Sequence, residues 1–405
     1  MKLVTVEDLK EGDIIASDVL LDDYTVVLSK GTVIKTPYIE KLRELEIFTI
    51  YIEDGENETV EPLVKNVKLT PKENKPPVKK PQVVQKNPEA PKSETGKPQA
   101  QKKEAPKKAP KVSMEKITIL RDDVEEQVKN KIKDILELHI HQKTAGLQKI
   151  AETAQNIITD ILEEEEVVEK VYDVKERSAD IYEHSLQVCT IAALIALKLG
   201  MTEKQVYDIS VSSLIHDLGL RYLVVRYEDQ DINLLPKKEQ EEYKKHPIYA
   251  YTAIKNETWL SETAKEIVLN HHEKKDSSGF PLGTDHISRM TQIVGVCDEF
   301  DELICGIGKA RVRVHEAINN IRNYSGIWYD SDIVESFLQL IAVYPVGSKV
   351  RTNQGEIGIV MKQNAHFPER PVIRIMKDRF GQAIQGEKII NLIKDTTVVI
   401  QEVVK

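Results

Sequence analysis

Apolar positions recur at helical spacing through the middle of this 405-residue chain, and the pattern changes at both ends. From Met114 to about Val343 they follow the period of 3.6 residues that gives a helix one buried face. After Pro345 the period changes to two, with glycines between the runs, which predicts a small β module over 344–405. The sequence therefore predicts a mainly α fold, with a helical domain over 114–343 and small β-rich modules at both ends.

The first 58 residues predict a small α+β module of their own. Two runs, Asp13–Val19 and Tyr24–Leu28, are rich in β-branched residues, and Phe48–Ile52 predicts a last strand. A helix is expected from Thr36, because proline follows it and is tolerated in the first helical turn. Two interpretations remain open: a plain structural appendage, or a regulatory or interaction module that could bind a protein partner or a second copy of the chain.

Residues 59–113 differ in composition from the rest of the chain. Between Glu61 and Lys111 there are 14 Lys, five Glu, no Arg and no Asp, so the segment carries +9 and the remainder of the chain −18. The same segment holds 10 of the 17 prolines. Such a composition cannot bury enough apolar surface to fold, and it predicts a disordered Pro/Lys-rich linker. Since arginine and interleaved aromatic residues are absent from it, we expect no nucleic-acid binding.

Cysteine usage and hydropathy restrict the class of protein. Cys189, Cys297 and Cys305 stand singly in apolar stretches, so they predict neither a disulfide framework nor a thiolate metal cluster. The longest apolar stretch, Ile191–Leu199, is too short to span a bilayer. The N-terminus turns acidic before an apolar signal core could form. We therefore expect a cytoplasmic protein without a transmembrane segment.

Histidine and aspartate residues occupy positions in the helical region where apolar residues would pack at lower cost. His184 shares a predicted helical face with Val188 and Ile191, and Asp298 follows Val294 by one turn. A buried carboxylate without a partner is strongly unfavourable, so imidazoles and carboxylates in one core indicate a divalent metal site. The candidate ligands are His184, His216, Asp217, His246, His271, His272 and Asp298. Taken singly, each histidine could instead be a hydrogen-bonded core residue.

The order and spacing of these motifs resemble the HD superfamily of metal-dependent phosphohydrolases, and more narrowly its HD-GYP branch, whose members hydrolyse cyclic di-GMP. The matching stretches are Tyr-Glu-His184-Ser, His216-Asp217-Leu-Gly, His246-Pro247, His271-His272-Glu and Asp298-Glu-Phe-Asp-Glu-Leu, and together they cover roughly 175 to 345. The resemblance implies that all seven candidates are metal ligands and that Asp217 and His216 are catalytic. It also implies two divalent transition-metal ions, with Fe or Mn favoured, and allows a third ion through Asp180.

The substrate loop of that branch is only partly present. The family has D-G-x-G-Y-P, and this chain has Asp276, Ser277, Ser278, Gly279, Phe280 and Pro281. The resemblance makes Asp276, Gly279, Phe280 and Pro281 candidate substrate-binding residues. Acidic residues of this region, Glu273 or Asp276, would orient the imidazoles.

Two cations of the family's substrate site are missing. The lysine after HD-x-G is replaced by Leu220, and the segment that carries a phosphate-binding arginine is replaced by 304–310. Nearby Lys309, Arg311 or Arg313 could substitute. The loss of two phosphate contacts could cost several kcal/mol of binding, on the order that charged hydrogen bonds contribute.

Three functions therefore remain open. The first, and our prediction, is a cyclic di-GMP phosphodiesterase with altered substrate contacts. The second is an HD phosphohydrolase that acts on another nucleotide or phosphoester. The third is a metal-stabilised receptor or scaffold for a cyclic dinucleotide, without turnover.

Overall fold

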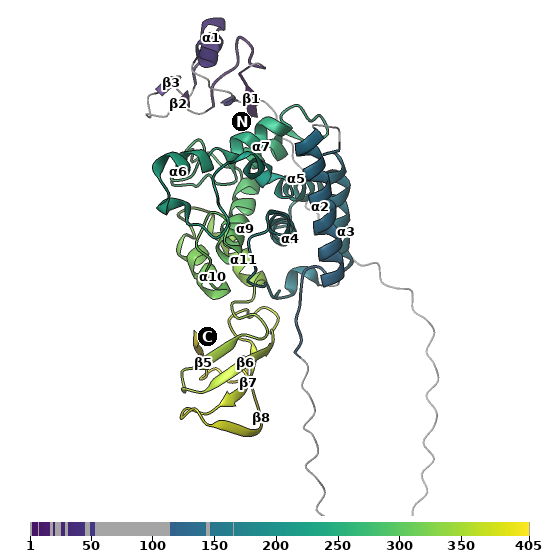
Figure 1. The fold of residues 1–405 in the computed structure, drawn as a ribbon, viewed down its shortest axis with the longest axis vertical. Helices are drawn as coiled ribbons and strands as arrows, with labels where there is room; N and C mark the ends of the chain where they lie inside the picture. The colour runs from purple at the N-terminus through teal and green to yellow at the C-terminus, as the bar shows by residue number, and fades with distance from the viewer. Residues whose placement is uncertain are drawn as a thin grey trace, which may run out of the picture.

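The protein is described by a computed structural model over residues 2–6, 8–16, 19–20, 26–28, 31–44, 49–52, 114–142, 146–164 and 166–404. An N-terminal module, a helical body and a C-terminal β module follow one another along the longest axis of the molecule (Figure 1). The mainly α prediction, with β-rich modules at both ends, is confirmed. The linker expected over 59–113 lies outside the described residues.

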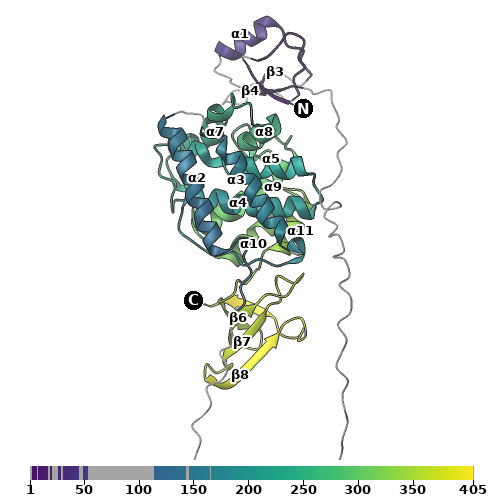
Figure 2. The ribbon, with the colours of Figure 1, turned by 90° about the vertical axis from the view of Figure 1, so that its right-hand side faces the viewer.

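The helical body holds the elements from α2 to α11. They are α2 (Asp122–Gln142), α3 (Lys149–Glu163), η2 (Val167–Glu169), α4 (Ile181–Lys198), α5 (Glu203–Ser213), η3 (His216–Tyr222), η4 (Ile232–Leu234), α6 (Lys237–Tyr243), α7 (His246–Ile254), α8 (Glu262–Asn270), α9 (Arg289–Cys305), α10 (Val314–Asn323) and α11 (Ser331–Leu340). In Figure 1, α2 and α3 lie on the right-hand side of the body, and α6 and α10 lie on the left. Figure 2 views the body from the side of α2 and α3. None of the described helices combines the length and apolar character that a bilayer span requires.

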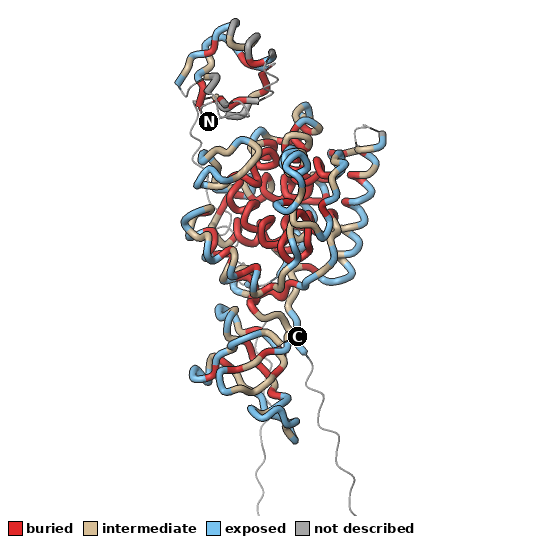
Figure 3. The backbone as a smooth tube through the Cα atoms, turned by 60° about the vertical axis from the view of Figure 1, so that its left-hand side comes forward, coloured by how far each residue is buried: buried red, intermediate tan, exposed pale blue. Residues whose placement is uncertain are grey.

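Helix α4 forms the centre of the body. Fifteen of its 18 residues are buried, so the helix is apolar on nearly all sides and other helices must cover it. Helices α2, α3, α5, α9 and α11 pack around it, and Figure 3 shows the buried backbone gathered there. The N-terminus of α4 is capped by Asp180, whose carboxylate accepts hydrogen bonds from the backbone N–H of Tyr182 (2.9 Å) and Glu183 (3.2 Å).

The N-terminal module has its own small core. Helix α1 (Thr36–Glu44) begins where the sequence predicts, and β4 (Thr49–Ile52) pairs antiparallel with β1 (Lys2–Thr5), a strand that we did not predict. The short strands β2 (Val19–Leu20) and β3 (Val26–Leu28) pair with each other. The core consists of Val6, Leu9, Ile15, Val19, Ile34, Leu42 and Ile50. A second, smaller cluster joins Ala16 to Tyr251 of α7 and Leu269 of α8, so the module packs on the helical body there.

The C-terminal module is a five-stranded antiparallel sheet in the order β8-β7-β6-β5-β9. Its strands are β5 (Lys349–Thr352), β6 (Ile357–Lys362), β7 (Val372–Lys377), β8 (Ala383–Asn391) and β9 (Ile400–Val403). The sequence did not predict β8, because this strand is mostly exposed and lacks the alternation of apolar and polar residues. Its place at the sheet edge, paired only with β7, explains why so few of its side chains are buried.

The separate cores predict that the helical body folds without the N-terminal module. A fragment from Met114 to Lys405 keeps the cores of the helical body and of the C-terminal module, and it loses the contacts of Ala16 with α7 and α8 and of β1 with α8. We expect its thermal unfolding midpoint, measured by circular dichroism, to lie within about 4 °C of the full chain, since about 1 kcal/mol shifts the midpoint of a domain of this size by about 2–4 °C. A fragment that aggregates or unfolds at far lower temperature would show that the N-terminal module is part of one cooperative fold.

Candidate metal centre

The seven candidate ligands converge in the middle of the helical body. His184 lies in the first turn of α4, His216 and Asp217 begin η3, His246 begins α7, His271 and His272 follow α8, and Asp298 lies in α9. All seven side chains are buried, and the most exposed, that of His272, is only 7% exposed. Residues that are up to 114 positions apart in the chain therefore meet at one place.

A glycine allows two of the elements to come together. Gly219 in η3 packs against the start of α7 so closely that a Cβ atom there would lie 1.8 Å from the carbonyl oxygen of His246 and 2.9 Å from the backbone nitrogen of Ala250. Any residue with a side chain would push η3 away from α7. The Gly219 contact thus brings Asp217 of η3 within reach of His246 of α7.

The carboxylate of Asp217 is shared between two sets of imidazoles. Its Oδ2 lies 3.3 Å from His184 Nε2 and 3.5 Å from His216 Nε2. Its Oδ1 lies 3.3 Å from His246 Nε2 and 3.7 Å from His271 Nε2. One oxygen therefore faces each set, which is the arrangement needed for a carboxylate that bridges two metal ions.

Asp298 completes the first set. Its Oδ1 lies 3.1 Å from His184 Nε2 and 3.3 Å from His216 Nε2, and its Oδ2 lies 3.3 Å from His272 Nδ1. Two groups of four potential ligands result, His184 with His216, Asp217 and Asp298, and Asp217 with His246, His271 and His272. Within each group the candidate ligand atoms all lie within 4.8 Å of one another.

Three imidazoles are oriented by backbone carbonyls three residues earlier in the chain. The Nδ1 atoms of His216, His246 and His271 lie 2.7, 2.8 and 2.8 Å from the carbonyl oxygens of Ser213, Tyr243 and Val268, respectively. A carbonyl can only accept a hydrogen bond, so Nδ1 donates and Nε2 keeps its lone pair. Each of these rings therefore presents a ligating nitrogen to the centre of the site.

The expectation that Glu273 or Asp276 orients the imidazoles is wrong. The Glu273 carboxylate accepts hydrogen bonds from the backbone N–H of Leu282 (2.5 Å), Gly283 (3.0 Å) and Thr284 (3.0 Å). It holds the far end of the loop that follows His272. The exposed Asp276 accepts hydrogen bonds from Ser278 within the same loop.

The electrostatics of the site favour ionised carboxylates. Burial opposes the charge on Asp217, but the adjacent His216 and the other imidazoles around it hold the pKa of this carboxyl well below its usual range. Burial also opposes the charge on Asp298, and His272 and His184 keep its pKa low. Burial lowers the pKa of His271, so its ring is neutral, as a metal ligand must be.

The carboxylates also act on the imidazoles. Although burial disfavours the charged forms of His216 and His184, the neighbouring aspartates raise the pKa of His216 and, more strongly, of His184. A cation in the site would take over the compensation of the two carboxylates.

The donor set fits divalent metal ions. Among the described residues, Asp217 Oδ1 and Asp298 Oδ2 are buried oxygens without a hydrogen-bond partner, and such oxygens are costly unless a cation satisfies them. Nitrogen and carboxylate ligands suit transition metals. The two groups around Asp217 can therefore hold metal. Asp180, the candidate for a third ion, caps α4 and belongs to none of the ligand groups formed by the described residues.

Phe280 covers the second set of imidazoles. Its ring stacks on His272, with centroids 4.3 Å apart and planes 28° apart, and lies 6.0 Å from the ring of His246. Gly279 before it packs so tightly that a Cβ atom would lie 2.5 Å from the Cα of Glu273. The peptide between Phe280 and Pro281 is cis. Three of the four candidate substrate-binding residues thus lie beside the site, and Asp276 lies at the exposed part of the loop.

Two of the three suggested substitutes for the missing phosphate-binding cations are engaged elsewhere. Lys309 forms ion pairs with Glu299 and with Glu302, the latter at 2.8 Å, and Arg311 pairs with Asp229 at 2.6 Å. Leu220, which occupies the lysine position of the family, is packed in the core and 1% exposed.

The sequence interpretation missed two carboxylates on α9. Asp301 lies one turn after Asp298, and its Oδ2 is 2.8 Å from His184 Nδ1. Glu302 Oε1 accepts a hydrogen bond from the Tyr243 hydroxyl at 3.2 Å and lies 4.0 Å from His272 Nε2. Burial raises the pKa of Glu302 to about 8, against the opposing charge of Lys309. Asp301 and Glu302 follow Asp298 by three and four residues, so all three lie on one face of the helix, and this spacing could have marked them as part of the site.

Comparisons with known proteins agree with this geometry. Residues 133–333 match the family described as HD domain, and residues 349–405 match the family described as KOW domain associated with HD domain. A cyclic di-GMP phosphodiesterase of Pseudomonas aeruginosa is 24% identical over 217 residues, which are 52% of this chain and 51% of that protein. Another from Thermotoga maritima is 29% identical over 168 residues, 40% of this chain and 45% of that protein.

The chain thus spans about half the length of these curated relatives. Among solved structures, an HDG"Y"P protein from Bdellovibrio bacteriovorus, Bd1817, is 15% identical with a TM-score of 0.42, over 83% of this chain and 97% of that chain.

The close packing at Gly219 gives a prediction about stability. Gly219→Ala should destabilise the protein by about 1–3 kcal/mol, the usual cost of forcing an extra methyl group into a packed core. Gly146→Ala is the matched control, since its Cβ atom would meet only the Leu138 side chain at 3.5 Å, an ordinary contact. Urea unfolding of both variants measures the difference. Equal stabilities would mean that η3 and α7 are not held together by this contact.

Proposed function

Since residues 133–333 form an HD domain of the HD superfamily, we propose that this chain is a metal-dependent phosphodiester hydrolase that acts on cyclic di-GMP. The observation that carries the proposal is the shared carboxylate of Asp217, with one oxygen facing His184 and His216 and the other facing His246 and His271. The names of the relatives support a cyclic dinucleotide as the substrate.

The site would supply Lewis-acid chemistry through its metals. We propose that His184, His216, Asp217 and Asp298 hold one ion and that Asp217, His246, His271 and His272 hold the other. A pair of divalent ions held there, with Fe or Mn favoured by the resemblance to the HD-GYP branch, would lower the pKa of water and neutralise charge on phosphoryl oxygens. A third ion through Asp180 would require this carboxylate to leave its capping position on α4.

The protein residues have three tasks in this reaction. The carbonyl-bound imidazoles of His216, His246 and His271 keep their Nε2 atoms directed inward, which holds the ligands ready before substrate binds. Burial of all seven ligands excludes bulk water and strengthens electrostatic interactions inside the site. Phe280, stacked on His272, is placed to contact a nucleobase or ribose of the substrate, together with Gly279, Pro281 and Asp276.

A second candidate function follows from the missing cations. Leu220 is buried in the core, and Lys309 is paired with two glutamates, so neither offers a free positive charge to a phosphate. This observation favours a phosphohydrolase for another nucleotide or phosphoester, or a cyclic-dinucleotide receptor that turns over slowly or not at all.

The modules on either side of the helical domain are also part of the proposal. We propose that 1–58, 114–343 and 344–405 are separate domains, and that the N-terminal one regulates the site or binds a partner. The proposal is supported by the packing of Ala16 on α7, which begins at His246, and on α8, which ends just before His271.

Bound metal is the first prediction of the proposed function. Protein purified without chelator, or reloaded with Fe²⁺ or Mn²⁺, should contain about two ions per chain, since the nitrogen and oxygen ligands form two groups. Asp217→Asn should lose most of both ions, because both groups use this carboxylate. Elemental analysis measures the stoichiometry. The control is Asp208→Asn, a buried carboxylate that hydrogen-bonds Ser261 and no imidazole. A wild-type protein that takes up no metal would contradict the proposal.

Hydrolysis is the second prediction. Metal-loaded protein should convert cyclic di-GMP to the linear dinucleotide or GMP, and removal of the metal or Asp217→Asn should lower kcat/KM by about 100-fold or more, as loss of charge stabilisation does. Chromatographic separation of products follows the reaction. Binding without cleavage would favour a receptor, and cleavage of a different phosphodiester would favour the second enzyme. If the protein neither binds nor cleaves cyclic di-GMP, this molecule is neither its substrate nor its ligand.

A further inference from the structure

We propose that Asp301 and Arg177 form a positioning pair for His184, and that this pair sets the affinity of the metal position that His184 shares with His216 and Asp298. The inference rests on the proposed metal-dependent function. It assigns a role to two side chains that are not ligands themselves.

His184 differs from the three carbonyl-bound imidazoles in where it lies on its helix. His216, His246 and His271 use carbonyls at or near the C-terminal ends of α5, α6 and α8, where carbonyl groups are left free by the end of the helix. His184 lies in the first turn of α4, and the carbonyl three residues earlier, that of Ile181, already accepts the Ser185 hydroxyl at 2.9 Å. Another group must therefore orient this ring.

Asp301 supplies that group from α9. Its Oδ2 lies 2.8 Å from His184 Nδ1, and both side chains are fully buried. With the carboxylate as acceptor, His184 carries its proton on Nδ1 and directs Nε2 at Asp217 and Asp298. A carboxylate acceptor is also charged, so it makes the opposite nitrogen more basic than a carbonyl does and strengthens it as a ligand.

Arg177 pairs with Asp301 and holds its carboxylate in place. Its Nη2 donates to the same Oδ2 atom, and its Nε lies 3.3 Å from Glu183 Oε1. A buried carboxylate without a cation is unstable, so Asp301 depends on this partner. Because Glu183 precedes His184 in the chain, the arginine bridges α9 to the helix turn that carries the ligand.

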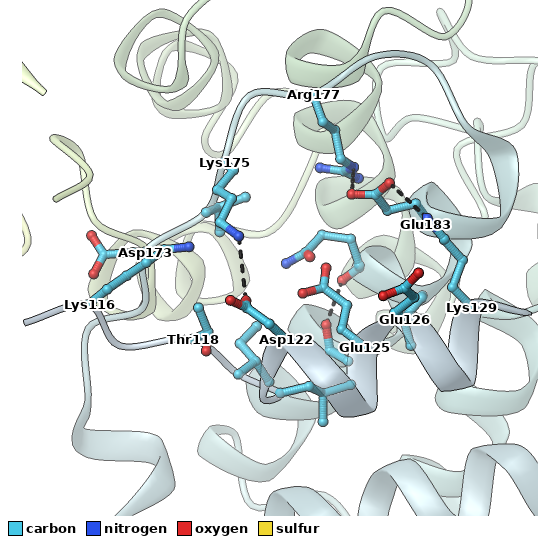
Figure 4. A pocket seen from close by; sticks show the side chains of 16 residues that line it. Lys116, Thr118, Asp122, Glu125, Glu126, Lys129, Asp173, Lys175, Arg177 and Glu183 are labelled. Carbon is cyan, nitrogen blue, oxygen red and sulfur yellow. Dashed lines mark hydrogen bonds and ion pairs between the residues drawn. The ribbon is translucent and has the colours of Figure 1, made fainter. Parts of the chain in front are cut away.

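The outer side of Arg177 faces a charged cavity of about 370 Å³. Figure 4 shows Arg177 directed at Glu183, and Glu183 directed in turn at Lys129 of α2, whose Nζ lies 3.7 Å from it. The metal ligands are not among the residues that line this cavity. Substitution of Arg177 or Asp301 leaves all seven candidate ligands themselves unchanged.

The test compares Asp301→Asn with wild type in the full-length chain. The asparagine amide has nearly the same shape as the carboxylate, but it carries no negative charge and so cannot form the ion pair with Arg177. We expect the affinity for one of the two ions to fall about 10- to 100-fold, the usual effect of removing a group that orients a ligand. The other ion, held by His246, His271 and His272, should bind as in wild type. Titration of metal-free protein with Mn²⁺ or Co²⁺, with bound metal measured at each step, separates the two affinities.

Two further variants separate positioning from a general effect on the fold. Asp301→Glu keeps the charge and should recover part of the lost affinity. Asp208→Asn, which removes a buried carboxylate that contacts no imidazole, should leave both affinities unchanged. The ring nitrogen signals of His184 in ¹H–¹⁵N spectra report its tautomer directly, and the proton should stay on Nδ1 in wild type and lose this preference in Asp301→Asn.

The outcomes are distinct. Wild-type affinity for both ions and an unchanged His184 tautomer in Asp301→Asn would overturn the positioning role. Equal weakening of both ions in Asp301→Asn, without recovery in Asp301→Glu, would also overturn it, since the variant would then have disturbed the whole site. Failure of wild type to bind either ion would instead refute the proposed function.

Discussion

The structure depends on the burial of two carboxylates, those of Asp217 and Asp298, in the core of a helical domain. Each is at most 2% exposed, and a charged group in such a position is strongly unfavourable unless cations or hydrogen bonds compensate it. Five imidazoles surround the two carboxylates, and one oxygen of each has no hydrogen-bond partner among the described residues. The arrangement is stable with cations in place and costly without them, which is the physical reason to interpret it as a metal centre.

Helix ends are arranged to serve this centre. Helices α5, α6 and α8 end close to it. Carbonyl groups at or near their C-terminal ends accept hydrogen bonds from the imidazoles of His216, His246 and His271. These hydrogen bonds satisfy carbonyls that would otherwise be orphaned at a buried helix end, and they fix the tautomer of each ring. Stability and function thus use the same bonds. His184, at the start of α4, is oriented by a side chain, that of Asp301.

The metal side of the site and the substrate side differ in completeness. All seven candidate ligands come together in two groups that could hold metal, whereas the lysine position is a core leucine, Leu220, and Lys309 is held by Glu299 and Glu302. Phe280 lies on His272 where a tyrosine would add a hydroxyl. Metal-dependent chemistry is therefore better supported than any one substrate, and cyclic di-GMP rests mainly on the relatives.

The sequence alone determined the class of fold and the identity of the candidate ligands. Helical periodicity marked the domain, and His184 and Asp298 stood out because polar residues occupied positions on buried helix faces. Helix ends and turns marked His216, Asp217 and His246 less clearly, so their assignment needed the resemblance of the whole motif order.

What orients the ligands was decided only by the tertiary structure. Local pattern does not specify which backbone carbonyl is free or which side chain meets a histidine 117 residues away, as Asp301 meets His184. Glu273 was given the wrong role for this reason, since its carboxylate accepts hydrogen bonds from the N–H groups of 282–284, further along the chain, rather than from a ring. The exposed strand β8 was missed because its pairing with β7, rather than its own side chains, defines it. In each case the deciding interaction joins residues that the local sequence pattern does not pair, whether 10 or 117 positions apart, and only the packed chain brings them together.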